Sequence, residues 1–380
     1  MKVQSIIPII LLIVIKCSFL TSKTYAQMDN SYFSWKRLNQ NKGDLSLQVE
    51  NLNYFRNVEY KTVVDEGRTL LGVQFVPELV YQIGPRTTWS AGLFIQRDFG
   101  GEPFEKAEPT FQLKHGFGNS TFLFGRLEGN MDHGLIEPII DPERVIFDRT
   151  ENGFQYLLNH RFVNMDVWLD WQTAIYQNSP FREEFDAGVS TRIKLIEKDS
   201  IKLHFPATVL ATHKGGEIDT SHQQAVSQFA FSYGTELTLV PKSSVLKSIR
   251  FGLVFNNYED VSNRAITFRD GLGQLAYLDL KWSHFGTQFS YWDSHQFEAS
   301  SGDVLYHTTS RQNPLRYTLD YRKLWMFRLY FEKQMSDDLN FLFRSNLIRD
   351  VHEETVDFIA EFYLRWTPTF HIAHIDAQSN

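Results

Sequence analysis

The residues best suited to metal chemistry lie near the C-terminus, where the sequence reads His371-x-x-His374-x-Asp376. Two imidazoles and a carboxylate are ligand types that bind zinc. The three residues stand on a short polar tail, however, and such a tail normally leaves its side chains in water. We therefore expect neither a metal site nor a cofactor.

A second group has the residue types of acid–base catalysis. His213 and His222 flank Glu217 and Asp219 on a stretch that reads as a surface loop. An imidazole beside a carboxylate or a hydroxyl can act as the general base in a hydrolysis reaction. None of the 12 histidines stands in a recognisable catalytic motif. The elements that carry these residues therefore decide what they can do.

The N-terminus has the layout of a secretory signal peptide. Lys2 precedes an apolar run at 6–15, which is about half as long as a membrane-spanning helix needs. We expect residues 1–26 to be removed, and with them three lysines, no acid and the only cysteine, Cys17. The 38 basic residues less these three leave 35 against 45 acidic ones. This balance argues against nucleic acid as a partner, and the loss of Cys17 excludes disulfides and a thiol nucleophile.

From Leu45 onward the chain alternates apolar and polar side chains with period two, which places successive side chains on opposite faces of a strand. Pro77 and Pro206 lie inside two of these segments and, because proline donates no ladder hydrogen bond, they predict local bulges. The segment 315–333 is long for one strand, and a hairpin within it would raise the count to seventeen or eighteen. Sixteen segments are expected: 45–54, 70–83, 87–97, 110–117, 121–130, 153–162, 165–176, 185–195, 201–212, 225–239, 248–257, 271–282, 286–296, 315–333, 338–349 and 355–366.

The connections between these segments alternate between short turns, such as 84–86, and long loops, such as 98–109. This alternation and an even strand count are typical of an all-β transmembrane antiparallel barrel with short periplasmic turns and long extracellular loops. A large secreted β-sandwich or solenoid is the alternative fold. Five aromatic residues at strand ends beside short turns fit a girdle at the membrane interface: Tyr81, Trp89, Phe162, Trp282 and Trp366.

The chain after the signal segment thus resembles a bacterial outer-membrane porin-type barrel, of the kind found in Bacteroidetes. The resemblance rests on strand pattern and not on a catalytic motif, and it implies an outer-membrane location. It divides the chain into the signal peptide 1–26, an N-terminal periplasmic or plug segment 27–44, the barrel 45–370 and a C-terminal tail 371–380. The tail is a departure, because many such barrels end at an aromatic residue.

If the apolar face of each strand meets lipid, the other face lines the lumen of the barrel. The last three strands then carry a wall of mixed charge. Mutual ion pairing that keeps this wall solvated and a dedicated substrate track both fit the pattern. The candidate pore-lining residues are Arg316, Arg322, Arg328, Arg344, Arg365, Asp357 and Glu361.

The connection 131–152 is too apolar for a freely solvated loop, so it must pack against something. It joins the fifth and sixth predicted strands, where the resemblance to sixteen-stranded porins implies a loop that folds inward and narrows the pore. A loop packed over the outer rim or against another chain is the alternative. The candidate constriction acids are Asp132, Glu137, Asp141 and Glu143.

These features predict a channel for passive or weakly selective diffusion of small hydrophilic solutes, and not an enzyme. The expected partners are outer-membrane lipid and the solutes themselves. The main alternative is a barrel that serves as a structural or partner-binding component of an envelope assembly or as a homo-oligomer. A barrel hydrolase that uses histidines at the rim is the third possibility.

Overall fold

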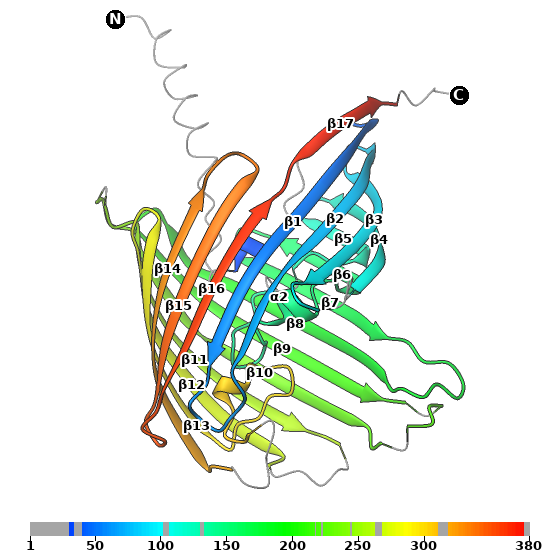
Figure 1. Ribbon diagram of the computed structural model, residues 1–380. Coiled ribbons are helices and arrows are strands. Elements are labelled where there is room, and N and C mark those ends of the chain that lie inside the picture. The colour runs from blue at the N-terminus through cyan, green and yellow to red at the C-terminus, as the bar shows by residue number, and fades with distance from the viewer. Residues whose placement is uncertain are drawn as a thin grey trace, which may run out of the picture.

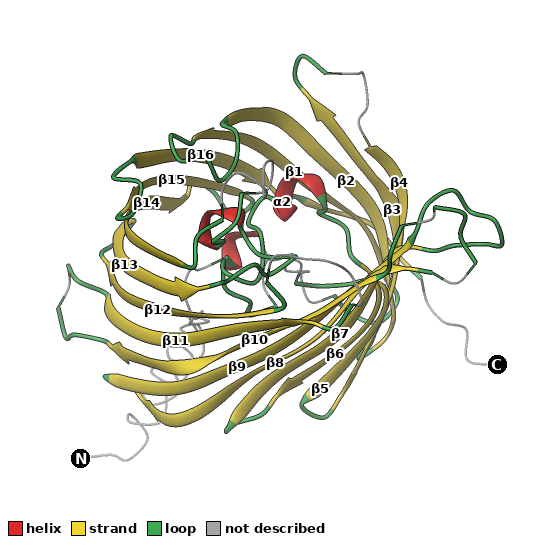
Figure 2. Cartoon of the chain, turned by 90° about the horizontal axis from the view of Figure 1, so that it is seen from below, coloured by secondary structure: helices red, strands yellow, loops and turns green. Residues whose placement is uncertain are grey.

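The chain folds into a closed antiparallel β-barrel (Figure 1). The computed structural model describes residues 30–33, 40–101, 106–129, 133–216, 218–221, 223–243, 245–262, 268–310 and 318–375. Each strand pairs with the next, and β16 returns to pair with β1, which closes the ring seen end-on in Figure 2. The predicted signal segment lies outside the described residues.

Seventeen strand segments make sixteen barrel strands, because β17 (Thr369–His374) continues β16 along the same neighbour, β1. Among the described residues, the helical elements are the short helix α2 (Arg144–Phe147) and two 3₁₀ turns, η2 (Ser31–Phe33) and η4 (Val304–Tyr306). The barrel strands are β1 (Asp44–Glu59), β2 (Arg68–Gly84), β3 (Thr87–Asp98), β4 (Lys106–Phe117), β5 (Ser120–Arg126), β6 (Asn152–Asn159), β7 (Val163–Thr173), β8 (Glu183–Lys198), β9 (Ile201–Gly215), β10 (Val226–Leu239), β11 (Ser248–Asp260), β12 (Asp270–Lys281), β13 (Phe285–His295), β14 (Tyr321–Gln334), β15 (Leu339–Asp350) and β16 (Val356–Trp366).

The predicted fold class, with sixteen strands, short turns at one end and long loops at the other, is confirmed. The alternative with eighteen strands is wrong, since β14 begins at Tyr321 and runs unbroken to Gln334. Strand pairing through β17 extends to His374, past the predicted barrel end at 370.

The predicted bulges at the two prolines are wrong. Val49 pairs with Pro77 and Arg192 pairs with Pro206 in ladders that keep their register at these points. On its other side each proline loses pairing locally, but the same register resumes beyond the gap. A missing N–H therefore removes ladder bonds here without inserting an extra residue.

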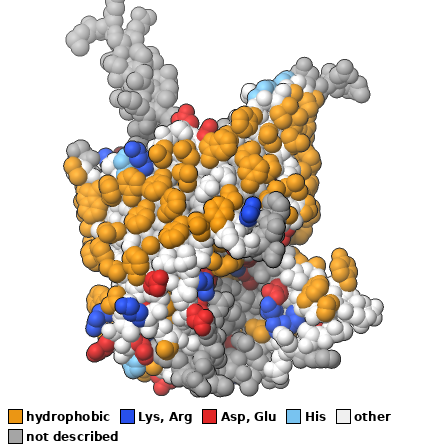
Figure 3. Space-filling model, viewed as in Figure 1, with side chains coloured by type: hydrophobic (Ala, Val, Ile, Leu, Met, Phe, Trp, Pro, Cys, Tyr) orange, Lys and Arg blue, Asp and Glu red, His pale blue; other side chains and the backbone are white. Residues whose placement is uncertain are grey.

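The outer surface of the barrel is an apolar belt, visible as the orange side chains across the wall in Figure 3. Large apolar residues such as Phe75, Phe251 and Phe289 are exposed there, while polar residues of the opposite parity such as Gln74 and Glu236 are buried inside. This inversion of a soluble protein's pattern is what a lipid environment requires, because backbone groups pair between the strands and the belt presents mainly apolar side chains to hydrocarbon. Among the residues that the structure describes, no helix is long and apolar enough to cross a membrane.

Part of the interior of the barrel is packed. Two extracellular loops fold inward, the β5–β6 loop (133–151) and the β13–β14 loop (296–310), and α2 and η4 are seen inside the ring of strands in Figure 2. Ile136, Ile139 and Tyr306 from these loops form a buried apolar core with wall residues such as Trp168 and Trp292. A smaller cluster joins the N-terminal Tyr32 and Phe33 to Val145, Ile146 and the wall.

Candidate functional site

The β5–β6 loop is fixed to the wall by ion pairs of two of its acids. Glu137 lies 2.8 Å from Arg328 Nη2 and accepts a hydrogen bond of 2.6 Å from the Tyr306 hydroxyl. Glu143 accepts from Arg56 Nε at 3.1 Å and from Arg68 Nε at 3.0 Å. The loop is thus bound to β14 and to β1 and β2, which are separated along the wall by β15 and β16.

The remaining predicted wall residues are engaged in the same way. Arg322 and Asp350 form a fully buried ion pair of 2.8 Å. Glu361 pairs with Arg56, and Asp357 accepts from the backbone of Lys61 and Thr62 in the β1–β2 loop.

Two further arginines hold the N-terminal segment. Arg344 donates to the Asn30 side chain at 3.3 Å, and Arg365 donates to the Tyr32 carbonyl. Asp141 accepts from the Glu143 amide at 2.8 Å and so shapes the first turn of α2. Arg316 and Asp132 lie outside the described residues. A role of these residues in lining or narrowing a pore stays a prediction, and their observed contacts tie loops and the N-terminal segment to the wall.

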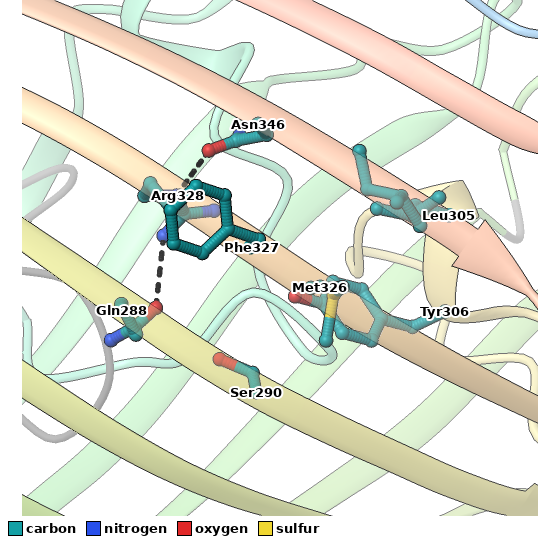
Figure 4. A pocket seen from close by; sticks show the side chains of 9 residues that line it. Gln288, Ser290, Leu305, Tyr306, Met326, Phe327, Arg328 and Asn346 are labelled. Carbon is teal, nitrogen blue, oxygen red and sulfur yellow. Dashed lines mark hydrogen bonds between the residues drawn. The ribbon is translucent and has the colours of Figure 1, made fainter.

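Little space is left where the two loops meet β13–β15. Figure 4 shows Tyr306 of the β13–β14 loop beside Met326, with Leu305 of the same loop nearby, and Arg328 bonded to Asn346 and Gln288 at 2.6 and 3.4 Å. The cavity among them measures about 10 Å³. That volume holds about one water molecule.

His133 joins the beginning and end of the β5–β6 loop to β7. Its Nδ1 lies 2.7 Å from Asp166 and its Nε2 2.7 Å from Glu151, and the ring stacks on Trp168 at 4.1 Å. Burial alone would lower the pKa of His133, but the two carboxylates raise it to about 10. The imidazole is therefore a cation at neutral pH and serves as a structural link.

A different kind of arrangement lies on the outer face of β9 and β10. His213 and Ser227 are directly paired across these strands, and His213 Nδ1 lies 2.8 Å from Ser227 Oγ. Both positions have the parity of Phe229, whose side chain is exposed on the outer surface. Because β9 ends and β10 begins at a long loop, the pair lies at the extracellular end of the lipid-facing surface.

Neighbouring groups hold both members of this pair. Phe185 stacks on the His213 ring at 5.0 Å, and Trp171 stacks on Phe185 at 5.3 Å, so that three rings extend across β7, β8 and β9. Ser227 donates its backbone N–H to Ser262 Oγ at 2.6 Å. A serine hydroxyl within hydrogen-bond reach of an imidazole, with both held in place, is the arrangement of a nucleophile and its general base.

A second hydroxyl–imidazole pair lies at the opposite end of the barrel. Thr87 Oγ1 and His115 Nδ1 are 2.9 Å apart at the beginning of β3 and the end of β4, beside a short turn. This pair faces the periplasmic side, so it meets the other leaflet of the membrane and offers a matched comparison for Ser227 and His213.

The sequence-based hydrolytic candidates are only partly brought together. Glu217 and His222 lie outside the described residues, and Asp219 accepts from Ser221 in the same loop. His374 pairs with Asp44 at 2.7 Å, while Asp376 is also outside the described part. Ser227 was not among the candidates, and the partner of His213 emerges only from the register of β9 and β10.

A closed barrel of antiparallel strands with an apolar belt defines a bacterial outer-membrane β-barrel protein, and the predicted resemblance and location are confirmed. Similar solved structures include the outer membrane protein OprD from Pseudomonas aeruginosa, with a TM-score of 0.50, 12% identity and coverage of 93% of this chain and 99% of that chain. Another is OpdL from the same organism, with a TM-score of 0.52, 11% identity and coverage of 86% of this chain and 99% of that one. At such identity the likeness concerns the fold.

The chain belongs to the Lipid A 3'-O-deacylase-type family, whose sequence model matches residues 37–375. No curated protein matches the chain. Because this is an enzyme family, our expectation that the chain is not an enzyme is wrong. The sequence contains no recognisable catalytic motif, but the catalytic residues of an enzyme need not lie close together in the sequence.

Proposed function

We propose that the chain is an outer-membrane hydrolase that removes an ester-linked acyl chain from a lipid of the outer leaflet. The observation that carries the proposal is the hydrogen-bonded Ser227–His213 pair on the lipid-facing surface at the extracellular end. The family name specifies removal of the 3'-O-acyl group of lipid A, and we take that lipid as the substrate.

The proposed reaction is acyl transfer through serine. His213 Nδ1 accepts the proton of the Ser227 hydroxyl as the serine oxygen attacks the ester carbonyl carbon, and the carbonyl electron pair moves to the carbonyl oxygen. Collapse of this intermediate breaks the bond to the sugar oxygen, which leaves with the proton from the imidazolium. Water then cleaves the acyl-serine by the same route and releases a fatty acid.

The surroundings of the pair suit an acyl chain. Two residues closer to the middle of these strands, and also facing outward, Ala187 pairs with Ala211, and Ala211 pairs with Phe229. Two small side chains beside a large exposed ring provide an apolar surface along which an acyl chain can lie. The ester bond at its head would then be at the level of Ser227.

The test is deacylation of lipid A in reconstituted vesicles, followed by mass spectrometry of the released fatty acid. Ser227→Ala should reduce the rate at least about 10³-fold, as loss of a serine nucleophile does in other hydrolases. The control is Thr87→Val, which removes the hydroxyl of the periplasmic pair and should leave the rate unchanged. Full activity of Ser227→Ala in a folded barrel would refute the proposal.

Diffusion of small hydrophilic solutes through the lumen is the second candidate function. It is favoured by the girth of a sixteen-stranded barrel, which encloses more space than its own wall side chains fill. Conduction would require the ion-paired β5–β6 loop to move, or to leave a continuous water-filled path beside it. Deleting 134–147 should therefore raise single-channel conductance, and an unchanged conductance in a folded barrel would exclude this loop as the constriction.

A further inference from the structure

Two outer loops lie next to the row of residues that contains the Ser227–His213 pair. The segment 174–182 connects β7 to β8, and the segment 218–221 belongs to the connection between β9 and β10. They are joined to each other, because the Asn178 amide donates to the Ile218 carbonyl and the Thr220 amide to the Ser179 carbonyl, both at 2.9 Å. We refer to these two segments as the paired loops.

The paired loops present large apolar side chains to the exterior. Tyr176 is 78% exposed, Phe181 49% and Ile218 48%. Extracellular loops in water normally bury such residues, and exposed apolar groups gathered in one place indicate an interaction surface. Their local backbone hydrogen bonds give this surface a defined shape.

This surface continues the lipid-facing wall of the barrel. Below the paired loops, Trp171, Phe185, His213 and Ser227 are paired in sequence across β7 to β10 at the extracellular end of the belt. In Figure 1 the green strands β8 and β9 lie obliquely toward the lower right, and the loop before β8 and the loop after β9 extend beyond the barrel wall at that end. The space-filling view has apolar side chains on that extension as well (Figure 3).

We propose that the paired loops insert into the head-group region of the outer leaflet and hold a lipid beside Ser227. The occupant is membrane lipid, because the exposed side chains are continuous with an established lipid interface. Tyrosine is also a residue that favours the boundary between head groups and hydrocarbon. Insertion of the loops into the membrane does not depend on the proposed hydrolase function, whereas their role in presenting a substrate rests on it.

The insertion is tested with a nitroxide label in vesicles of outer-membrane lipid, at cysteines that replace Tyr176 or Ile218 in a Cys17→Ser background. Collision with oxygen rises inside the membrane, whereas collision with a water-soluble nickel chelate falls. Labels at 176 and 218 should collide with oxygen more and with the nickel chelate less than a label in water, and should lie shallower than a label at Val189→Cys, in the middle of the exposed barrel wall. Behaviour like that of Glu354→Cys, in the exposed β15–β16 turn, would overturn the insertion.

The substrate role is tested with the double variant Tyr176→Asp and Phe181→Asp. It should raise the lipid concentration needed for half-maximal deacylation at least 10-fold and leave the maximal rate nearly unchanged, whereas Ser227→Ala abolishes the rate. An unchanged concentration dependence would overturn the substrate role. If Ser227→Ala is fully active, the hydrolase proposal fails, but the label depths still decide whether the paired loops enter the membrane.

Discussion

Replacing Glu143 with alanine should release the β5–β6 loop from the β1–β2 side of the lumen. The buried Arg56 would lose one of its carboxylate partners, and breaking a buried ion pair costs about 3 kcal/mol. The contact with Arg68 contributes less than about 1 kcal/mol, because that side chain is 30% exposed. Since every 1.4 kcal/mol is about tenfold, the population with the loop undocked should rise about 100-fold.

The assay is the labelling rate of a cysteine at Val145, a residue of α2 that is 1% exposed. A reagent reaches this position only when the loop opens, so the rate follows the undocked population. Asp148→Ala is the control, because it removes a loop carboxylate whose pair with Arg144 is more exposed. It should change the rate less than about fivefold.

Acid should act through the same carboxylate. Burial raises the pKa of Glu143, but Arg56 and Arg68 outweigh burial and hold it below its usual value. A depressed pKa means that the stabilisation is present above the unfolded pKa, about 4.3, and is lost as pH falls through the folded value. Labelling at position 145 should therefore accelerate on acidification, and less so in Glu143→Ala. Equal rates in the two proteins at neutral pH, with the barrel intact, would refute the role of Glu143 in docking the loop.

Two further predictions concern the loop and the belt. His133 has a raised pKa, so its stabilisation of the loop is complete below about pH 6.5 and lost as pH rises through about 10. The protection of loop amides from hydrogen exchange, relative to their intrinsic exchange rates, should fall over this interval, and the fall should be absent in His133→Gln. Cysteines on the belt should react with membrane-restricted thiol reagents, whereas cysteines of the opposite parity, such as those replacing the buried Gln74 and Ser190, should not react with them. Reaction at the inner positions and not on the belt would contradict the assignment of faces. The belt positions are Phe75, Leu79, Leu93, Val189, Leu203, Phe229, Phe251, Leu278, Phe289, Phe327, Phe341 and Phe358.

The barrel could be predicted because its determinants are local. In β16, alternate residues from Val356 to Trp366 are apolar, and the observed burial alternates in step with them. Side-chain direction in a strand follows position alone, so parity assigns the lipid face without knowledge of any partner. A bulge at Pro206 was wrongly predicted, because the sequence shows that proline lacks an N–H donor but does not show whether the neighbouring strands keep their register.

The site depends on pairings that no local pattern contains. The apolar content of the β5–β6 loop correctly indicated burial, but Arg56 and Arg68 were not recognised as partners of Glu143. Their proximity follows from packing across the lumen. Likewise Ser227 meets His213 only because the hairpin register aligns them. Extending the two predicted strands symmetrically about their loop would have paired His213 with Gln224, because the observed register is offset from that symmetric pairing.

The packed lumen and the lipid-facing pair are connected through the strands that separate them. Thr212, next to His213, bonds Ser300 at 2.8 Å on the inner side of the wall. Gln228, next to Ser227, bonds the Glu298 carbonyl at 3.1 Å and accepts from the Ser300 amide. The β13–β14 loop thus supports the backbone on both sides of the pair from within. A functional site keeps its geometry best on rigid elements, so these inner contacts are consistent with chemistry on the exterior.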